Sequence, residues 1–412
     1  MPPKSKSFAG AYNGVLGDRG WVLVCSRGLR PRTTGHTEAG YSSEAGCHWL
    51  LASQCLNDVD NLMTMHHILD PDSTAIQTWL AERGLPAYRA TQIRRWLFAG
   101  RAQSFDDMSD LPKELRSALA AEFRIWTSRV LKQKQTDDGT EKLLLELEDS
   151  QQIECVLLRD GPRRTICIST QVGCAMGCVF CASGLAGVAR NLTAGEIVEQ
   201  MLHLDRLLPE GERLSHIVVM GMGEPLANVD RLIPALAEAS SPAGLGISPR
   251  RITISTVGIP AAMHRLAERG SKYNLAVSLH APNDLLRNML VPVNKNIGLT
   301  GILEAADHYF ETSGRRLTFE YVLLAELNDR PEHARELASL LAGRTALLNV
   351  IPYNPVAGLP YHTPSERAVS RFVETLRAAG INVQVRERKG DKIDAACGQL
   401  RRANMQVLTA GA

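Results

Sequence analysis

Gln171-Val-Gly-Cys174-Ala-Met-Gly-Cys178-Val-Phe-Cys181 is the stretch that decides the fold. Its three cysteines are separated by three and then two residues, between an apolar run and a glycine-rich segment. Three thiolates on one short loop can bind three irons of a [4Fe–4S] cube and leave the fourth iron open to another ligand. The alternatives are three plain thiols or zinc, but structural zinc prefers four ligands, commonly in paired C-x2-4-C spacing. The spacing therefore favours a [4Fe–4S] cluster held by Cys174, Cys178 and Cys181.

Length and composition limit the class of protein. With 412 residues the chain can bury a large core in two or three domains. Nine cysteines are too few for a disulfide scaffold, and their clustering indicates redox chemistry in a reducing compartment. No apolar run approaches a membrane span and no signal peptide is evident, so we expect a cytoplasmic protein without a membrane partner. A net charge of +2 does not by itself indicate a nucleic-acid partner.

The first part of the chain divides into two predicted regions. Residues 1–62 are rich in Gly, Ser and Arg without sustained periodicity, which predicts a disordered extension or a start site placed too early; a targeting arm is the alternative. We expect this extension to be dispensable. Residues 63–126 show helical apolar spacing and predict a small accessory domain. Its arginines 89, 94, 95 and 101 are either a solvated face or contacts to RNA phosphates.

A run of predicted strands follows the accessory domain. Residues 127–164 form a β linker region with strands at 128–134, 142–148 and 152–158 and a hairpin turn at Asp137-Asp138-Gly139. Glu154 stands among apolar neighbours in the last of these strands. Taken alone, that position carries no functional meaning.

Residues 165–380 alternate strand and helix, which is typical of a parallel α/β sheet. The expected strands are 165–170, 215–220, 251–256, 273–279, 317–323 and 347–352. The expected helices are 193–208, 228–239, 260–269, 299–312, 331–342 and 364–379. Six such units predict a partial (β/α)6 barrel. Residues 381–412 are expected to add a strand and a loop that carries Cys397.

Polar motifs fall where five of the predicted strands end. They are the cluster loop, Gly221-Met-Gly223-Glu224-Pro225, Ser255-Thr256, Ser278-Leu279-His280 and Pro352-Tyr353-Asn354-Pro355. Each is weak alone: the glycines suit a tight turn, a lone His is commonly a satisfied core residue, and Asn354 can cap a turn. Because barrels place their chemistry at the carboxyl ends of the strands, we expect these motifs to meet at one mouth.

With these motifs in place, the chain resembles the RlmN/Cfr branch of the radical S-adenosylmethionine (SAM) enzymes over residues 150–400. The resemblance rests on C-x3-C-x2-C, Ile153-Glu154, the step from Cys167 to Cys174, Gly-Met-Gly-Glu-Pro, Ser-Leu-His, Ile-Pro-Tyr-Asn-Pro, and the tail Gly390-Asp-Lys-Ile-Asp-Ala-Ala-Cys397-Gly-Gln-Leu400. It implies SAM as a cofactor beside the cluster. It also implies SAM contacts from Gly223, Glu224, Ser255, Ser278, Leu279, His280 and Asn354.

The resemblance implies a mechanism for methylating carbon 2 of adenine, which is electrophilic. Cys397 takes a methyl group from one SAM as a thiolate nucleophile. A second SAM is cleaved to a radical that activates this methyl group for addition to the base. Glu154 is then the expected proton acceptor, and Cys167 attacks the sulfur of Cys397 to release the product and leave a disulfide. A buried structural thiol is the alternative for Cys397, but its basic neighbours (386, 388, 389, 392, 401 and 402) favour a reactive one.

The resemblance also implies partners. These are 23S rRNA at the peptidyl-transferase centre, tRNA next to the anticodon, and an electron donor such as flavodoxin or ferredoxin, with the enzyme acting as a monomer. The alternative within the family is methylation of carbon 8 of the same rRNA base. A non-catalytic iron–sulfur or zinc RNA-binding protein is a third possibility, although binding alone would require neither Cys167 nor Cys397.

Overall fold

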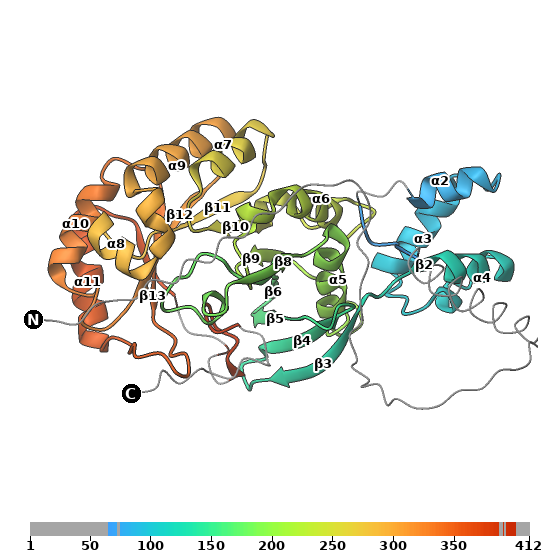
Figure 1. Ribbon diagram of the computed structural model, residues 1–412, viewed down its shortest axis with the longest axis horizontal. Helices are drawn as coiled ribbons and strands as arrows, with labels where there is room; N and C mark the ends of the chain where they lie inside the picture. The colour runs from blue at the N-terminus through green and yellow to red at the C-terminus, as the bar shows by residue number, and fades with distance from the viewer. Residues whose placement is uncertain (1–64, 72–74, 387–389, 391–392, 401–412) are drawn as a thin grey trace, which may run out of the picture. The chain divides into compact units, whose positions relative to one another are not determined.

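The computed structural model describes residues 65–71, 75–386, 390 and 393–400 (Figure 1). They belong to one compact unit that spans Asp60–Ala412. The predicted extension at 1–62 lies outside the described residues, as do the basic residues 388, 389, 392, 401 and 402.

A ten-stranded sheet in the order β14-β13-β12-β11-β10-β9-β6-β5-β4-β3 organises this unit. Seven of its strands are parallel: β6 (Arg163–Cys167), β9 (His216–Val219), β10 (Ile252–Thr256), β11 (Asn274–Ser278), β12 (Leu317–Leu323), β13 (Leu347–Pro352) and β14 (Val383–Val385). The sheet is open, because β14 and β3 are its two edges. The predicted partial barrel is confirmed.

A helix follows each of the first six parallel strands, as predicted. They are α5 (Ala194–Asp205), α6 (Val229–Ser240), α7 (Pro260–Glu268), α9 (Leu299–Ser313), α10 (Pro331–Leu341) and α11 (Glu366–Ala378). Their apolar sides pack on the outer face of the sheet (Figure 1), where strand residues such as Ile254 and Phe319 are fully buried. The inner face is left to the polar residues at the strand ends. A further short helix, α8 (Asp284–Leu290), lies after β11 and was not predicted.

The predicted β linker is continuous with the barrel sheet. Strands β3 (Ser128–Gln135), β4 (Glu141–Leu147) and β5 (Gln152–Asp160) are antiparallel, and β5 pairs with β6. Asp160 and Arg163 are partners across this last pairing, so only two residues, Gly161 and Pro162, turn the chain. The prediction started the first barrel strand at 165 and therefore missed this hairpin. Its effect is to bring Glu154 to the edge of the parallel sheet.

The accessory region consists of short elements. They are β1 (His66–His67), α2 (Ala75–Glu82), α3 (Tyr88–Phe98), α4 (Lys113–Glu122) and β2 (Phe123–Arg124). Two of the predicted phosphate contacts bind the barrel instead: Arg94 pairs with Glu238, and Arg101 with Asp205 at 2.8 Å. Arg94 and Arg101 therefore form ion pairs within the protein.

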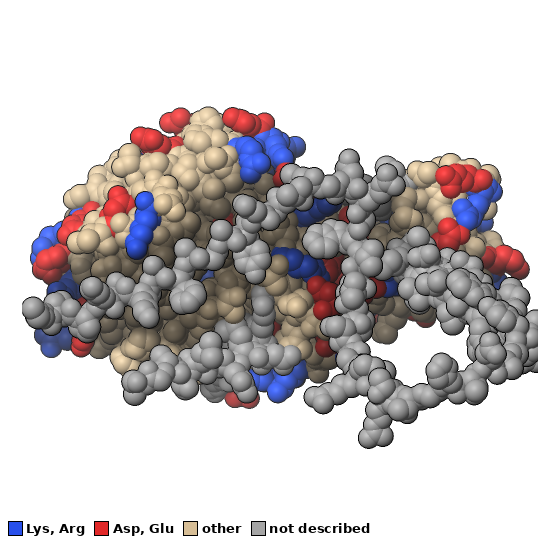
Figure 2. All heavy atoms as spheres, in the orientation of Figure 1, with Lys and Arg blue, Asp and Glu red and all other residues tan. Residues whose placement is uncertain are grey.

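Surface charge is mixed on the face drawn in Figure 2. Where the described residues are visible in this view, basic and acidic side chains are interspersed. Within the described ranges, no helix combines the length and the apolar character that crossing a bilayer requires.

Candidate active site

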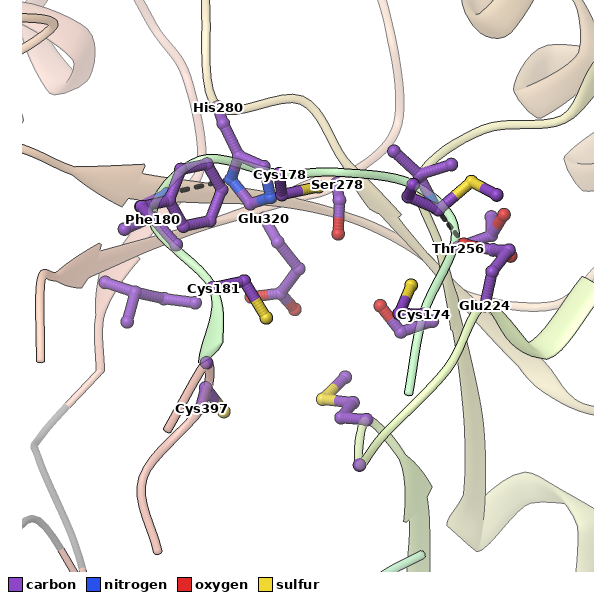
Figure 3. Close-up of a pocket in the computed structure, with 18 of the residues that line it drawn as sticks. Cys174, Cys178, Phe180, Cys181, Glu224, Thr256, Ser278, His280, Glu320 and Cys397 are labelled. Carbon is purple, nitrogen blue, oxygen red and sulfur yellow. Dashed lines mark hydrogen bonds between the residues drawn. The ribbon is translucent and has the colours of Figure 1, made fainter. Parts of the chain in front are cut away.

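The carboxyl ends of the parallel strands surround one cavity (Figure 3). Cys174, Cys178, Cys181 and Cys397 all line it. The sequence-predicted residues Gly223, Glu224, Ser255, Ser278, His280 and Asn354 line it as well. Segments more than two hundred residues apart in the chain therefore share one site, as the positions of the motifs predicted.

The loop that carries the three cysteines starts from a small hairpin that the sequence did not predict. Strand β7 (Gln171–Gly173) pairs with β8 (Val188–Asn191), and residues 174–187 between them form what we call the cluster loop. Burial raises the pKa of the Cys174 thiol to about 12 and also raises the pKa values of Cys178 and Cys181. Such thiols stay protonated until a metal centre compensates for the charge of the thiolates.

The donor set fits a cube better than a single ion. Zinc binds each thiolate at about 2.3 Å, so its ligands must converge on one point. Among the described residues, no three His, Cys, Asp or Glu side chains converge in that way. A cube tolerates wider spacing because each cysteine binds a different iron. Cys174, Cys178 and Cys181, which all line the cavity, could hold a [4Fe–4S] cluster.

Glycine is required at position 223 for two reasons. Its φ of 104° is unfavourable for other residues, and a Cβ atom there would lie 2.7 Å from the Cβ of Gln171. The carboxylate of neighbouring Glu224 is hydrogen-bonded within the protein. It accepts hydrogen bonds from the backbone N–H groups of Leu226 (3.0 Å) and Val257 (2.8 Å). Burial raises the pKa of Glu224, and the Val257 bond opposes that shift. A ligand would therefore meet the backbone edge of this turn.

Ser278 and His280 reach the cavity, whereas Leu279 between them does not. The side chain of Leu279 is fully buried, and its backbone N–H donates to the carbonyl of Glu320. Leu279 can therefore take part only through its backbone.

His280 is held as a neutral ring. Its Nδ1 accepts a hydrogen bond from the Val322 N–H at 3.1 Å, and Phe180 packs edge-on against it. Its φ of 61° is the left-handed conformation, which the carbonyl bond from Asn328 (2.8 Å) helps to fix. Burial lowers the pKa of His280 to about 3.

This low pKa predicts a pH-dependent stability. The unfolded ring has a pKa near 6.5, so the unfolded state binds the extra proton between pH 6.5 and 3. The contribution of the neutral, buried ring to the free energy of unfolding is therefore complete above pH 6.5 and is lost as the pH falls toward 3. When the pH falls from 7 to 5.5, the free energy of unfolding of both proteins is expected to decrease. The decrease should be about 1 kcal/mol smaller for His280→Asn than for the wild type, because the variant has no ring to protonate in the unfolded state. Urea denaturation of the cluster-free proteins at both pH values measures this, and equal losses would contradict a neutral buried ring.

The segment that carries Cys397, which we call the C-terminal loop (393–400), is tied to the rest of the site. The Ala182 N–H donates to the carbonyl of Gly398 (2.8 Å), and Gln399 Nε2 donates to the carbonyl of Pro355 (2.9 Å). Asn354 Nδ2 donates to the Cys397 carbonyl oxygen at 3.5 Å. The Oδ1 atom of Asn354 is buried and accepts no hydrogen bond from the described residues. These contacts place Cys397 at the edge of the cluster loop, with Asn354 Oδ1 available to a ligand.

Cys167 lies at the end of β6 on the inner face and is only 8% exposed. Burial and, to a lesser extent, a negative charge on Cys397 raise its pKa to about 12, and the Arg386 guanidinium opposes both effects. Cys167 does not line the cavity, yet it lies within electrostatic reach of Cys397. Both are free thiols in this structure.

Glu154 lies outside the cavity lining, on the neighbouring strand β5. Its Oε1 is 2.8 Å from Nζ of Lys142, in an ion pair whose two side chains are at most 10% exposed. The same Nζ donates to the Asp394 carbonyl at 2.8 Å. Lys142 thus connects the glutamate to the C-terminal loop.

Sequence reasoning missed Glu320 and gave Arg386 only a general role. Glu320 lines the cavity from β12 and pairs in register with Ser278. Its Oε1 accepts from Asn349 at 3.0 Å, and its Oε2 accepts no bond within the part of the chain that the structure describes. Burial raises the pKa of Glu320, and Arg386 opposes the shift. A carboxylate inside the apolar run Leu317–Leu323 was the available signal.

Comparison with protein families matches two segments. Residues 168–338 match the radical SAM superfamily, and residues 66–125 match the ribosomal RNA large subunit methyltransferase N-terminal domain. The first match includes the parallel strands β9 to β12, and the second covers the accessory region from β1 to β2.

Full-length relatives are similar to the chain over most of its length. A dual-specificity RNA methyltransferase RlmN of Rhodopirellula baltica is 61% identical, covering 83% of this chain and 92% of the relative. The enzyme of the same name from Symbiobacterium thermophilum is 48% identical, over 78% and 87%. A radical SAM methyltransferase from Sphaerobacter thermophilus has a similar crystal structure, with a TM-score of 0.79 and 43% identity over 82% of this chain and 99% of that one.

Proposed function

The chain belongs to the RlmN family of radical SAM RNA methyltransferases, and from this membership we propose that it methylates carbon 2 of an adenosine in 23S rRNA and in tRNA. The observation that carries the proposal is the arrangement of Cys397 and Cys167. Cys397 lines the same cavity as the three cluster cysteines, and Cys167 is electrostatically coupled to it. An iron–sulfur protein that only bound RNA would need neither thiol.

Members of this family use a [4Fe–4S] cluster and SAM. When bound, the two supply a 5′-deoxyadenosyl radical. We propose that Cys174, Cys178 and Cys181 hold the cluster. The proposed SAM contacts are the backbone at Gly223 and Glu224, the side chains of Ser255, Ser278, His280 and Asn354, and the backbone of Leu279. Two observations support this assignment: Oδ1 of Asn354 has no hydrogen-bond partner among the described residues, and the glycine at 223 is closely packed.

Two cysteines and one glutamate carry the proposed steps at the base. Cys397 accepts a methyl group from one of two SAM molecules used per turnover and presents its carbon to adenine C2. Glu154 accepts the proton lost from C2, and its contact with Lys142 supports this role because a neighbouring cation favours the carboxylate form. The Cys167 thiolate then attacks the Cys397 sulfur, and the bond from that sulfur to the product carbon breaks. The released carbon takes up a proton and becomes the methyl group, and the disulfide that remains is reset by cellular reductants.

The remaining partners follow from the same proposal. Residues 66–125 would bind RNA as an accessory domain, with Arg89 and Arg95 as the phosphate contacts that do not pair with the barrel. The enzyme would act as a monomer and receive electrons from flavodoxin or ferredoxin. Adenosines in loops suit such an enzyme, because an unstacked base can enter a cavity at a barrel mouth.

Mass spectrometry of RNA nucleosides tests the proposal directly. Cells with and without the gene are compared for 2-methyladenosine and 8-methyladenosine, in rRNA and tRNA separately. We expect 2-methyladenosine to disappear from both RNAs when the gene is deleted. Loss of 8-methyladenosine instead would assign the chain to the carbon-8 reaction, and loss from one RNA alone would reject dual specificity.

A further inference from the structure

Arg287 is a buried cation that the proposed chemistry does not use. It lies in α8 and is 0% exposed. Its Nε donates to the Leu279 carbonyl at 3.0 Å, and its Nη2 donates to the carbonyls of Val257 (2.5 Å) and Ser278 (2.8 Å). Its Nη1 donates to Oδ1 of Asn294. These acceptors are all neutral, although a buried guanidinium is ordinarily paired with a carboxylate.

Asp284, a carboxylate on the same helix, does not pair directly with the Arg287 guanidinium. Asp284 Oδ1 accepts from Asn294 Nδ2 (2.8 Å) and from the Leu299 N–H (2.9 Å), so Asn294 stands between Asp284 and the guanidinium. Burial lowers the pKa of Arg287 to about 10, and Cys178 opposes the shift more than Asp284 does. Arg287 therefore remains charged at neutral pH, and a negative charge on the cluster cysteine Cys178 would stabilise it more than Asp284 does.

The position of α8 links three parts of the site. The carbonyls that Arg287 binds lie at or just after the ends of β10 and β11, which also carry Ser255 and Ser278. At the end of the same helix, the Leu290 carbonyl accepts from the Val179 N–H, inside the cluster loop, at 3.1 Å. Helix α8 is thus bonded to the cluster loop and to two strand ends of the proposed SAM site.

We propose that Arg287 is a positioning residue that supplies the buried counter-charge for the cluster and fixes the strand ends that hold SAM. Each cluster thiolate contributes a negative charge, and reduction adds one more. A fixed cation in a medium of low dielectric constant stabilises the reduced form more than the oxidised form. Net charge and neighbouring hydrogen bonds are among the factors that set the reduction potential of such clusters. The charge part of this proposal needs only the cluster; the SAM part rests on the proposed SAM contacts.

Two substitutions separate charge from hydrogen bonding. Arg287→Gln removes the charge, whereas Arg287→Lys keeps it but cannot bond Val257, Ser278 and Leu279 together. The proteins are reconstituted anaerobically without RNA, and redox titration and SAM binding are measured. For Arg287→Gln we expect the ratio of reduced to oxidised cluster at a fixed potential to be about tenfold lower. This corresponds to a reduction potential lowered by about 59 mV for a one-electron couple. For Arg287→Lys we expect the wild-type potential with weaker SAM binding.

Arg335→Gln is the control, because it removes an exposed cation paired with Glu332 and should leave both measurements unchanged. An iron-loaded Arg287→Gln protein with the wild-type potential would overturn the charge role. If Arg287→Gln does not retain iron, the Arg287→Lys protein tests the proposal instead. A reduction potential below that of the wild type, or SAM binding equal to that of the wild type, would then contradict it. The titration contains no RNA, so its outcome is independent of which carbon or which RNA is methylated.

Discussion

A protein with Cys167 replaced by alanine will stall with RNA covalently attached to Cys397. Cys397 remains free to accept a methyl group and to add it to the base, but no thiol is left to release the product. Cys397→Ala stops earlier and gives neither methylated protein nor methylated RNA, while the cluster stays intact. The two variants should therefore fail in different ways, because the proposed mechanism uses their thiols at different times.

A denaturing gel with labelled RNA, SAM and reductant distinguishes these outcomes. A slowly migrating, protease-sensitive RNA band should appear with Cys167→Ala and not with Cys397→Ala. Cys155→Ala is the matched control: Cys155 is a fully buried thiol on the adjacent strand β5, outside the cavity, and its loss should leave turnover in place. Normal turnover by Cys167→Ala, or a band with neither variant, would reject the assigned roles.

Replacing Cys178 by alanine will abolish the cluster and all RNA methylation. The wild-type protein, purified anaerobically, should contain about four irons and four sulfides per chain. Cys178 lies between the other two ligands in the cluster loop, so its loss leaves two thiolates for a centre that needs three. Cys174→Ala and Cys181→Ala should have the same effect, since each thiol serves a different iron.

Iron and sulfide analysis together with the visible absorption spectrum measures this loss. Cys155→Ala again serves as the control and should keep the full iron content. Circular dichroism of the cluster-free variant checks that the barrel remains folded. Stoichiometric zinc without iron in the reconstituted wild type would contradict the cluster assignment.

The parallel barrel was predictable because its signals are local. Segments such as 317–323 and 347–352 are short and mostly apolar, and the structure places β12 and β13 at those positions. The short strands ended at polar motifs, so their meeting at one mouth followed from the rule for parallel sheets. The cysteine spacing was equally local and needed no tertiary information.

Features that depend on distant contacts were not predictable. The pairing of β5 with β6 requires a tight turn at Gly161-Pro162, which the sequence reading placed between separate regions. Helix α8 is too short for a clear period, and Arg287 within it looks like any surface arginine until its burial is known. Glu154 had meaning only through family resemblance, because its partner Lys142 belongs to another strand.

The low acidity of Cys167 has a consequence for the order of events. While Cys397 is an anion, burial and that charge both oppose ionisation of Cys167, so the two thiols cannot readily be thiolates together. A thioether carries no charge, so methylation of Cys397 would remove one of these two effects and leave Arg386 to favour the Cys167 thiolate. In the proposed reaction, Cys167 would therefore become easier to ionise, and so a better nucleophile, only after Cys397 carries its methyl group, while burial continues to raise its pKa. In the resting enzyme the charge of Cys397 would help to keep Cys167 protonated and unreactive.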